Sequence, residues 1–266
     1  MAIMRTFLIC HQQEVLNRVG LARWLASFSE LTGILVLEET AGQKRRRIIR
    51  EIKRLGPLRF LDVLAFRLYY AALLRRNDHE WEQSLLAELC ERYPEVPAGT
   101  PVLTSSSPNT QAAREFVSNA APDLMIARCK TLLKEEVFSI PVDGTFVMHP
   151  GICPEYRNSH GCFWALSNND LDRVGMTLLR IDRGVDTGPV FGYYSCRYDE
   201  RRESHIVIQH RTVFDNLDAL KEKLISIHEK RAHTIDVQGR KSAAWGQPWL
   251  TTYLRWKRAA RSRHTV

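Results

Sequence analysis

Short apolar runs in the first 150 residues constrain the fold of this chain most strongly. Five of them have the length and composition of buried strands: residues 6–10, 32–37, 102–105, 124–127 and 145–148. Segments with helical spacing separate some of these runs, one following the first run at 15–28 and another at 111–120. Strands that alternate with helices form a parallel sheet with helices on both faces. We therefore expect an α/β fold with a mostly parallel, doubly wound sheet.

Residues 40–96 interrupt this alternation with three helical stretches. These are a basic helix at 43–55, a helix at 58–74 that follows Pro57, and a helix at 81–93. The middle helix carries an apolar face made of Phe60, Leu64, Tyr69 and Leu73. We interpret the segment as a helical insertion that packs on the domain or forms a homodimer contact. Binding of a membrane surface by its basic residues is the less favoured alternative.

The second half of the chain continues the core and then becomes helical. Two further strands are expected at 176–180 and 190–196, followed by an amphipathic helix at 217–230. We therefore divide the chain into an α/β domain at 1–205, which contains the insertion, and a C-terminal helical extension at 206–266 that ends in a basic tail.

The composition places the chain among cytoplasmic globular proteins. It has six cysteines without a CxxC pair, which suits reduced thiols. It has neither the apolar core of a signal peptide nor an apolar stretch long enough to span a membrane. The net charge of +8 is concentrated in basic runs at 44–47 and 255–264. Such runs attract phosphate without specificity, so neither nucleic acid nor a membrane is an expected partner.

Two polar residues are the first candidates for chemistry. His149 directly follows an expected strand, and Asp186 lies 37 positions later in the turn Gly184-Val185-Asp186-Thr187-Gly188. Ligands of open α/β sheets bind beyond the carboxyl ends of the strands, which is where His149 is expected. A histidine exchanges a proton near neutral pH, and a nearby aspartate would favour its charged form. The alternatives are a structural histidine and a turn aspartate that binds backbone amides.

Other chemistries have less support in the sequence. His149, Cys153, His160 and Cys162 are zinc ligand types, but their spacing matches no common zinc motif, so we expect no metal. There is no GxSxG motif for a nucleophilic serine. The segment after the first expected strand has no glycine with which to cradle a phosphate.

The region around His149 resembles the 10-formyltetrahydrofolate-dependent formyltransferases, which act on glycinamide ribonucleotide, methionyl-tRNA or amino sugars. Their signature reads roughly Asn-x-His-x-Ser-Leu-Leu-Pro-x-Tyr-Arg-Gly, then Gly-x-Thr-Leu, then Asp-x-Gly. The residues that match it in order are His149, Pro154, Tyr156, Arg157, Gly175, Thr177, Leu178, Asp186 and Gly188. The resemblance covers residues 100–200 and implies a Rossmann-like formyltransferase core.

The resemblance also implies roles for individual residues. His149 would stabilise the oxyanion that forms when an amine attacks the formyl carbon, and Asp186 would keep His149 protonated through a water. 10-Formyltetrahydrofolate would be the cosubstrate, held in a slot lined largely by backbone. The residues expected there are Arg128, Cys129, Lys130, Leu132, Asp182, Gly184 and Val185. Those expected to contact the acceptor are Tyr156, Arg157 and His160.

One residue departs from the signature. Val147 stands where the family has an asparagine that donates a hydrogen bond to the oxyanion. Losing one such donor costs about 2.7–4 kcal/mol. Three accounts remain open: Asn158, Ser159 or His160 supplies the missing donor, the protein is a slow enzyme for an unusual substrate, or it binds folate without catalysis. We list Asn158 with His149 and Asp186 as the catalytic candidates.

The expected acceptor is the amine of a small molecule, such as an amino sugar or a modified amino acid. The missing glycines disfavour glycinamide ribonucleotide, and the residues after the last matched strand are few for the tRNA enzyme's appended barrel. The alternative function is a folate-binding protein on the same fold that is catalytically silent or hydrolytic.

Overall fold

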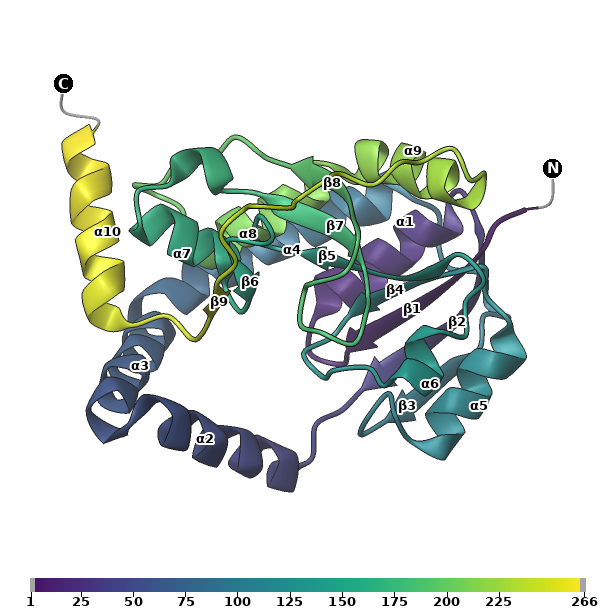
Figure 1. Ribbon diagram of the computed structural model, residues 1–266, viewed down its shortest axis with the longest axis horizontal. Helices are drawn as coiled ribbons and strands as arrows, with labels where there is room; N and C mark the ends of the chain where they lie inside the picture. Colours follow the sequence, from purple (N-terminus) through teal and green to yellow (C-terminus); the bar gives the residue numbers. More distant parts are fainter. Residues whose placement is uncertain (1–2, 264–266) are drawn as a thin grey trace.

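The core of the protein is one seven-stranded sheet (Figure 1). A computed structural model describes residues 3–263, so His264 of the basic tail lies outside the described residues. The strands are β1 (Arg5–His11), β2 (Glu30–Leu37), β3 (Val102–Ser105), β4 (Leu124–Arg128), β5 (Gly144–His149), β7 (Met176–Arg180) and β8 (Val190–Tyr194). Their order is β3-β2-β1-β4-β5-β7-β8. The first five in this order pair in parallel, while β7 is antiparallel to both β5 and β8. The expected α/β class with a mostly parallel sheet is confirmed.

The strands form because their apolar runs are covered on both faces. In β1, Phe7 and Ile9 face one side while Leu8 and Cys10 face the other, and all four are fully buried. Continuous apolar runs of this kind are typical of parallel strands between two helical layers. Each run expected in the first 150 residues became a strand, with ends within two residues of those observed.

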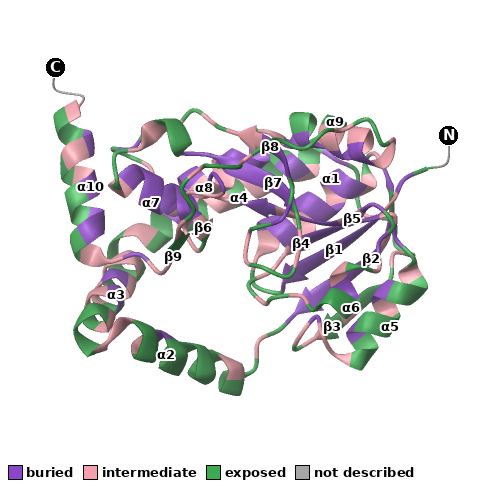
Figure 2. Ribbon diagram, in the orientation of Figure 1, coloured by how far each residue is buried: buried purple, intermediate pink, exposed green. Residues whose placement is uncertain are grey.

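Helices cover the two faces unequally. One face packs against η1 (Leu16–Leu21), α1 (Ala22–Ala26), α4 (Arg75–Arg92), α8 (His205–Phe214) and α9 (Leu217–His228). The opposite face packs against α5 (Gln111–Ala120) and the short α6 (Glu135–Phe138) near β1, β2 and β4. Figure 2 shows the buried sheet between these layers. The expected helix at 15–28 is thus split into a π-helical and an α-helical part, and α8 was not anticipated.

The helical insertion consists of α2 (Ala41–Leu55), α3 (Pro57–Tyr69), η2 (Tyr70–Leu74) and then α4. Thr40 and Gln43 form a capping box at the start of α2, and Gly56, at φ 77°, permits the turn into α3. α2 lies away from the sheet and α3 lies beside α10 (Leu250–Arg263) (Figure 1). The predicted packing face of α3 was wrong, because Val63 and Phe66 are its buried residues.

A second, aromatic core joins the insertion to the C-terminal part of the chain. Phe66 of α3 packs with Phe163 of α7 (Gly161–Ser167) and with Tyr253 of α10. The remaining elements are η3 (Leu171–Arg173), β6 (Arg157–Asn158) and β9 (Ala244–Trp245), and β6 pairs in parallel with β9. No helix within residues 3–263 is long and apolar enough to cross a membrane.

Candidate active site

β5 brings His149 to the carboxyl edge of the sheet. Phe146 and Met148 point into the large core on one face, so Val147 and His149 share the other face. Only 4% of His149 is exposed, and it lies opposite Thr177 of β7. β5 runs one residue further than expected, so His149 is its last residue and lies at the carboxyl end of the strand.

Both ring nitrogens of His149 face acceptors. Nε2 lies 2.8 Å from the carbonyl oxygen of Tyr156, and Nδ1 lies 3.4 Å from Oδ2 of Asp186. A carbonyl and a carboxylate oxygen only accept, so only the doubly protonated imidazolium donates in both directions. The contact to Asp186 is long for a hydrogen bond, so Nδ1 could also donate to an oxygen that lies to one side of the line between the two groups.

Two glycines let the loop after His149 fold back onto it. A Cβ on Gly161 would lie 2.5 Å from the Cα of Gly151 and 2.7 Å from the oxygen of Tyr156. The Thr177 hydroxyl donates to the Gly151 oxygen at 2.6 Å and accepts from the Cys153 amide at 3.0 Å. These contacts hold the Tyr156 carbonyl against the imidazole.

Asp186 is tied to the same loop from the other side. Its Oδ2 accepts the backbone N–H of Asn158 at 2.7 Å, and Arg157 donates to the oxygen of Val185 at 2.8 Å. The side-chain amide of Asn158 donates to the carbonyl of Trp245 at 2.5 Å. His149, Asp186 and Asn158, the three catalytic candidates, therefore lie together at one edge of the sheet.

Comparisons with known proteins identify the family of the chain. A family model described as formyl transferase matches residues 77–224, which is more than half of the 266-residue chain. The chain belongs to the formyl transferase family. Methionyl-tRNA formyltransferase of Thermotoga neapolitana is 29% identical over 133 residues, which cover 50% of this chain and 38% of that protein. The chain thus matches well under half of the length of this curated relative.

Solved formyltransferase structures share the fold. A sugar N-formyltransferase from Shewanella sp FDAARGOS_354 superposes with a TM-score of 0.54 at 12% identity, covering 95% of this chain and 87% of that one. Glycinamide ribonucleotide transformylase 1 from Symbiobacterium toebii gives a TM-score of 0.52 at 12% identity, covering 90% and 93%. Identities this low show a common fold only.

A segment that lies outside the family match packs against the loop after His149. Residues 235–246, called the strap below, run along the loop 153–158. Arg240 of the strap forms a bidentate ion pair with Glu155, at 2.6 and 2.9 Å, and the indole N–H of Trp245 donates to the Glu155 carbonyl at 2.8 Å. Sequence reasoning assigned the strap no role, although its Trp-Gly-Gln-Pro-Trp end is an unusual local pattern.

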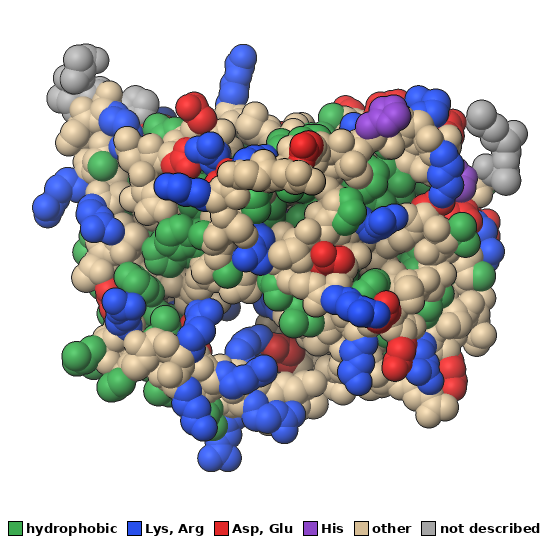
Figure 3. All heavy atoms as spheres, in the orientation of Figure 1, with side chains coloured by type: hydrophobic (Ala, Val, Ile, Leu, Met, Phe, Trp, Pro, Cys, Tyr) green, Lys and Arg blue, Asp and Glu red, His purple; other side chains and the backbone are tan. Residues whose placement is uncertain are grey.

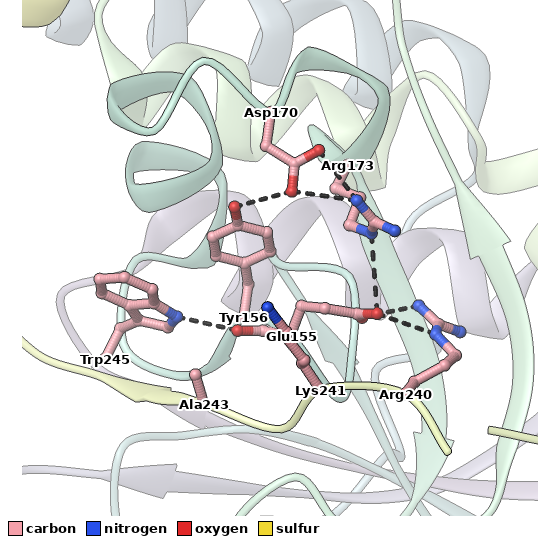
Figure 4. Close-up of a pocket in the computed structure, with 8 residues that line it drawn as sticks. All are labelled: Glu155, Tyr156, Asp170, Arg173, Arg240, Lys241, Ala243 and Trp245. Atoms are coloured by element: carbon pink, nitrogen blue, oxygen red, sulfur yellow. Dashed lines mark hydrogen bonds and ion pairs between the residues drawn. The ribbon is translucent and has the colours of Figure 1, made fainter. Parts of the chain in front are cut away.

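A pocket of about 520 Å³ lies between the strap and the loop (Figure 4). Its lining residues are Glu155, Tyr156, Asp170, Arg173, Arg240, Lys241, Ala243 and Trp245. Tyr156, expected to contact the acceptor, has its ring here, stacked on Trp245 with its hydroxyl donating to Asp170 at 2.9 Å. Burial raises the pKa of the Tyr156 hydroxyl to about 12, so it stays protonated.

Val147, at the position of the missing asparagine, lies in an apolar environment. It packs beside Cys153, Leu179 and Val190, together with Val237 of the strap. An amide at this position would therefore face apolar neighbours.

The first half of the expected cosubstrate slot, residues 128–132, is tied to the protein at several points. Arg128 is half-buried and donates to the carbonyl of Met148 and, at 3.2 Å, to Asn17, so its side chain holds the end of β5. Burial lowers the pKa of Arg128. The amide of Lys130 donates to His11 at 3.0 Å, and burial raises the pKa of the Cys129 thiol to about 12. Leu132 is 64% exposed.

The second half of that slot, residues 182–186, lies next to the first. Oδ1 of Asp182 accepts from the amide of Gly184 at 2.9 Å, which fixes the turn. Arg183 in this turn pairs with Glu135, just beyond the first loop, at 2.8 Å. The two expected halves are thus neighbours in space.

His160, the last expected acceptor residue, lies in the aromatic core. Its ring is 5.5 Å from that of His205, centroid to centroid, and its Nδ1 is shielded from solvent. Burial lowers the pKa of His160 to about 4, so the ring is neutral at pH 7. Within residues 3–263, no three His, Cys, Asp or Glu side chains converge as a metal site requires.

Proposed function

We propose that the protein transfers a formyl group from 10-formyltetrahydrofolate to the amine of a small molecule, such as an amino sugar or a modified amino acid. The observation that carries the proposal is the position of His149 between the Tyr156 carbonyl and the Asp186 carboxylate. A fixed imidazole at a sheet edge, with an N–H that can point at the reacting oxygen, is a group that could stabilise the oxyanion of an acyl transfer.

The roles of the residues follow from their contacts. The cosubstrate would supply a formyl group whose oxygen gains negative charge as the acceptor nitrogen attacks. The bond from the formyl carbon to the folate nitrogen then breaks, and that nitrogen leaves with the proton given up by the acceptor amine. His149 donates from Nδ1 to that oxygen, while the Tyr156 carbonyl keeps the ring in place through Nε2. Asp186 keeps the imidazole charged and accepts the proton released by the amine, through a water. The loops 128–132 and 182–186 would hold the pteridine, and the contact between Arg183 and Glu135 supports their acting as one slot.

Asn158 is the proposed replacement for the missing asparagine. Its backbone N–H donates a hydrogen bond to Asp186, which places the residue beside that carboxylate, and its side chain is exposed. One hydrogen of its amide is used by the Trp245 carbonyl, so the second is the one that would reach the formyl oxygen. His160 is a poorer candidate for this donor, because its ring is enclosed and neutral.

The test is a calorimetric titration of the protein with a stable analogue of 10-formyltetrahydrofolate. We expect micromolar binding that weakens in Asp186→Ala and is unchanged in Asp172→Ala, an exposed aspartate of η3. Formyl transfer to a panel of amino sugars and amino acids is then compared between the parent and His149→Ala. Absence of binding at millimolar analogue would refute the cosubstrate assignment.

A second candidate function, folate binding with hydrolysis or without catalysis, is favoured by the apolar surroundings of Val147. The two candidates differ in their response to Val147→Asn and Asn158→Ala. If Asn158 has taken over as the oxyanion donor, Asn158→Ala lowers transfer about 100- to 1,000-fold. If the site is silent for lack of a donor, Asn158→Ala changes nothing, and Val147→Asn raises a slow transfer above the parent's.

A further inference from the structure

The first part of the helical insertion, from α2 to η2, is strongly basic. Residues 41–76 contain eleven Lys and Arg against two acidic residues, whereas the whole chain has a net charge of +8. Four of these basic residues, Lys44, Arg45, Arg46 and Arg50, are exposed on α2 and have no ion-pair partner in the described part of the chain. The field of this segment therefore attracts an anionic surface.

The same segment exposes apolar side chains that a folded domain normally buries. Leu58, Leu61 and Leu68 of α3 are 82%, 58% and 64% exposed. With Leu64 and Leu73, which are 39% and 61% exposed, they form what we call the leucine patch. Their spacing of three to five residues places most of them along one outward side of the helix.

The opposite side of α3 is already occupied, so the leucine patch cannot turn inward. Arg59 lies over the ring of Trp249 at 5.5 Å, and Asp62 accepts the amide of Thr251 at 3.1 Å. Phe66 is buried against α7 and α10, and Arg67 pairs with Glu51 of α2 at 2.6 Å. These contacts fix the rotation of α3 about its axis, with the leucines outward. Figure 3 shows hydrophobic side chains where α2 meets α3 and Lys and Arg side chains along α2.

We propose that the outer face of α2 and α3 docks on a membrane surface that contains anionic lipids. Exposed leucines flanked by arginines match an interface in which apolar side chains enter the acyl boundary and cations meet the headgroups. This peripheral contact requires no spanning helix, which agrees with the absence of one in residues 3–263. The proposal departs from the expectation that no membrane is a partner and takes up the alternative of membrane-surface binding that was less favoured on the sequence alone.

A second copy of the chain and nucleic acid fit this face less well than a membrane surface. A twofold dimer places the same patch of each copy against the other, so it would bring two strongly basic segments together. Nucleic acid would neutralise the arginines but would leave the leucines without apolar partners. An anionic lipid surface satisfies both groups at once.

The experiment is co-sedimentation of the full chain with vesicles of phosphatidylcholine alone or mixed with phosphatidylglycerol. We expect binding only to the mixed vesicles, with an affinity that falls as salt is raised. The triple variant Leu58→Gln/Leu61→Gln/Leu68→Gln should bind about tenfold more weakly or worse. Its matched control, Ile3→Gln/Val102→Gln/Val142→Gln, alters three residues of similar exposure outside the insertion and should bind as the parent does.

A charge variant completes the test. Each basic residue near an anionic surface contributes roughly fivefold, so Arg45→Gln/Arg46→Gln/Arg50→Gln should lose on the order of a hundredfold in vesicle affinity. Arg197→Gln/Arg201→Gln/Arg202→Gln removes the same charge before α8 and should change binding far less. Three results would overturn the proposal: no binding to the mixed vesicles, equal binding by the leucine variant, or a dimer in solution that the leucine variant converts to monomer.

Discussion

The contact between Gly151 and Gly161 yields the sharpest prediction, because the atoms that a methyl group would strike are all backbone. A Cβ on Gly161 would lie 2.5 Å from the Gly151 Cα, 2.7 Å from the Tyr156 oxygen and 2.8 Å from the Pro150 oxygen. None of these atoms can rotate away as a side chain could. Gly161→Ala must therefore move the loop that holds the Tyr156 carbonyl against His149.

The expected loss of stability follows from the contacts that give way. Overpacking a tight site costs about 1–3 kcal/mol, and an intramolecular hydrogen bond such as that between His149 and the Tyr156 carbonyl contributes about 0.5–1.5 kcal/mol. Because relaxing the clash sacrifices part of the hydrogen bond, the two costs overlap. We therefore expect the free energy of unfolding to fall by about 2–3 kcal/mol. For a chain of this size that corresponds to a fall in Tm of roughly 4–12 °C.

Thermal and urea unfolding measure this loss without any assumption about function. The control is Gly42→Ala, also at the start of a helix, where the nearest atom to a new Cβ is 4.0 Å away. Alanine favours helix by up to about 1 kcal/mol over glycine, so Gly42→Ala should leave the protein as stable or slightly more so. A Tm for Gly161→Ala within one degree of the parent would refute the reasoning.

Three further predictions concern the walls of the site. Burial holds the pKa of His160 at about 4, so between pH 6.5 and 4 the unfolded chain binds a proton at this residue that the folded chain does not. The free energy of unfolding should therefore fall as the pH is lowered through this range, and it should fall less steeply in His160→Phe. Urea unfolding at a series of pH values measures the difference. Arg240→Met leaves Glu155 with only Arg173 at 3.7 Å, which should cost about 1–2 kcal/mol and speed proteolysis within the strap. Tyr156→Phe removes the hydrogen bond to Asp170 but keeps the carbonyl on His149, so calorimetry should find about 1 kcal/mol less stability and unchanged binding of the folate analogue.

Periodicity predicted the sheet well because the strands of this fold are buried on both faces. The runs that became β1, β2, β4 and β5 are apolar at nearly every position, and their burial is nearly complete. The pairing of His149 with Asp186 followed from their place in an ordered pattern of residues. The strands and the motif that contains His149 and Asp186 can both be identified from short stretches of sequence.

The strap and the outward side of α3 could not be predicted in this way. The bond from Arg240 to Glu155 joins positions 85 residues apart, and the segment around Arg240 has no periodicity that indicates a partner. For α3, apolar residues occur all around the helix, so hydropathy alone cannot say which side is buried. Polar anchors decide it, since Arg59 and Asp62 find partners in the C-terminal part of the chain.

The strap also changes how the departure at Val147 is understood. Val147 does not sit alone in a polar site, because Cys153 of the active-site loop and Val237 of the strap form an apolar cluster with it. Val147 is half-buried among these side chains, so an asparagine there would gain few hydrogen-bond partners from the protein. At the other end of the same strap, Trp245 accepts the side-chain amide of Asn158 and so orients it beside Asp186. The strap thus contacts both the position where the family has its asparagine and the amide of Asn158, and the contact to Asn158 is the observation that supports the proposal of a relocated donor.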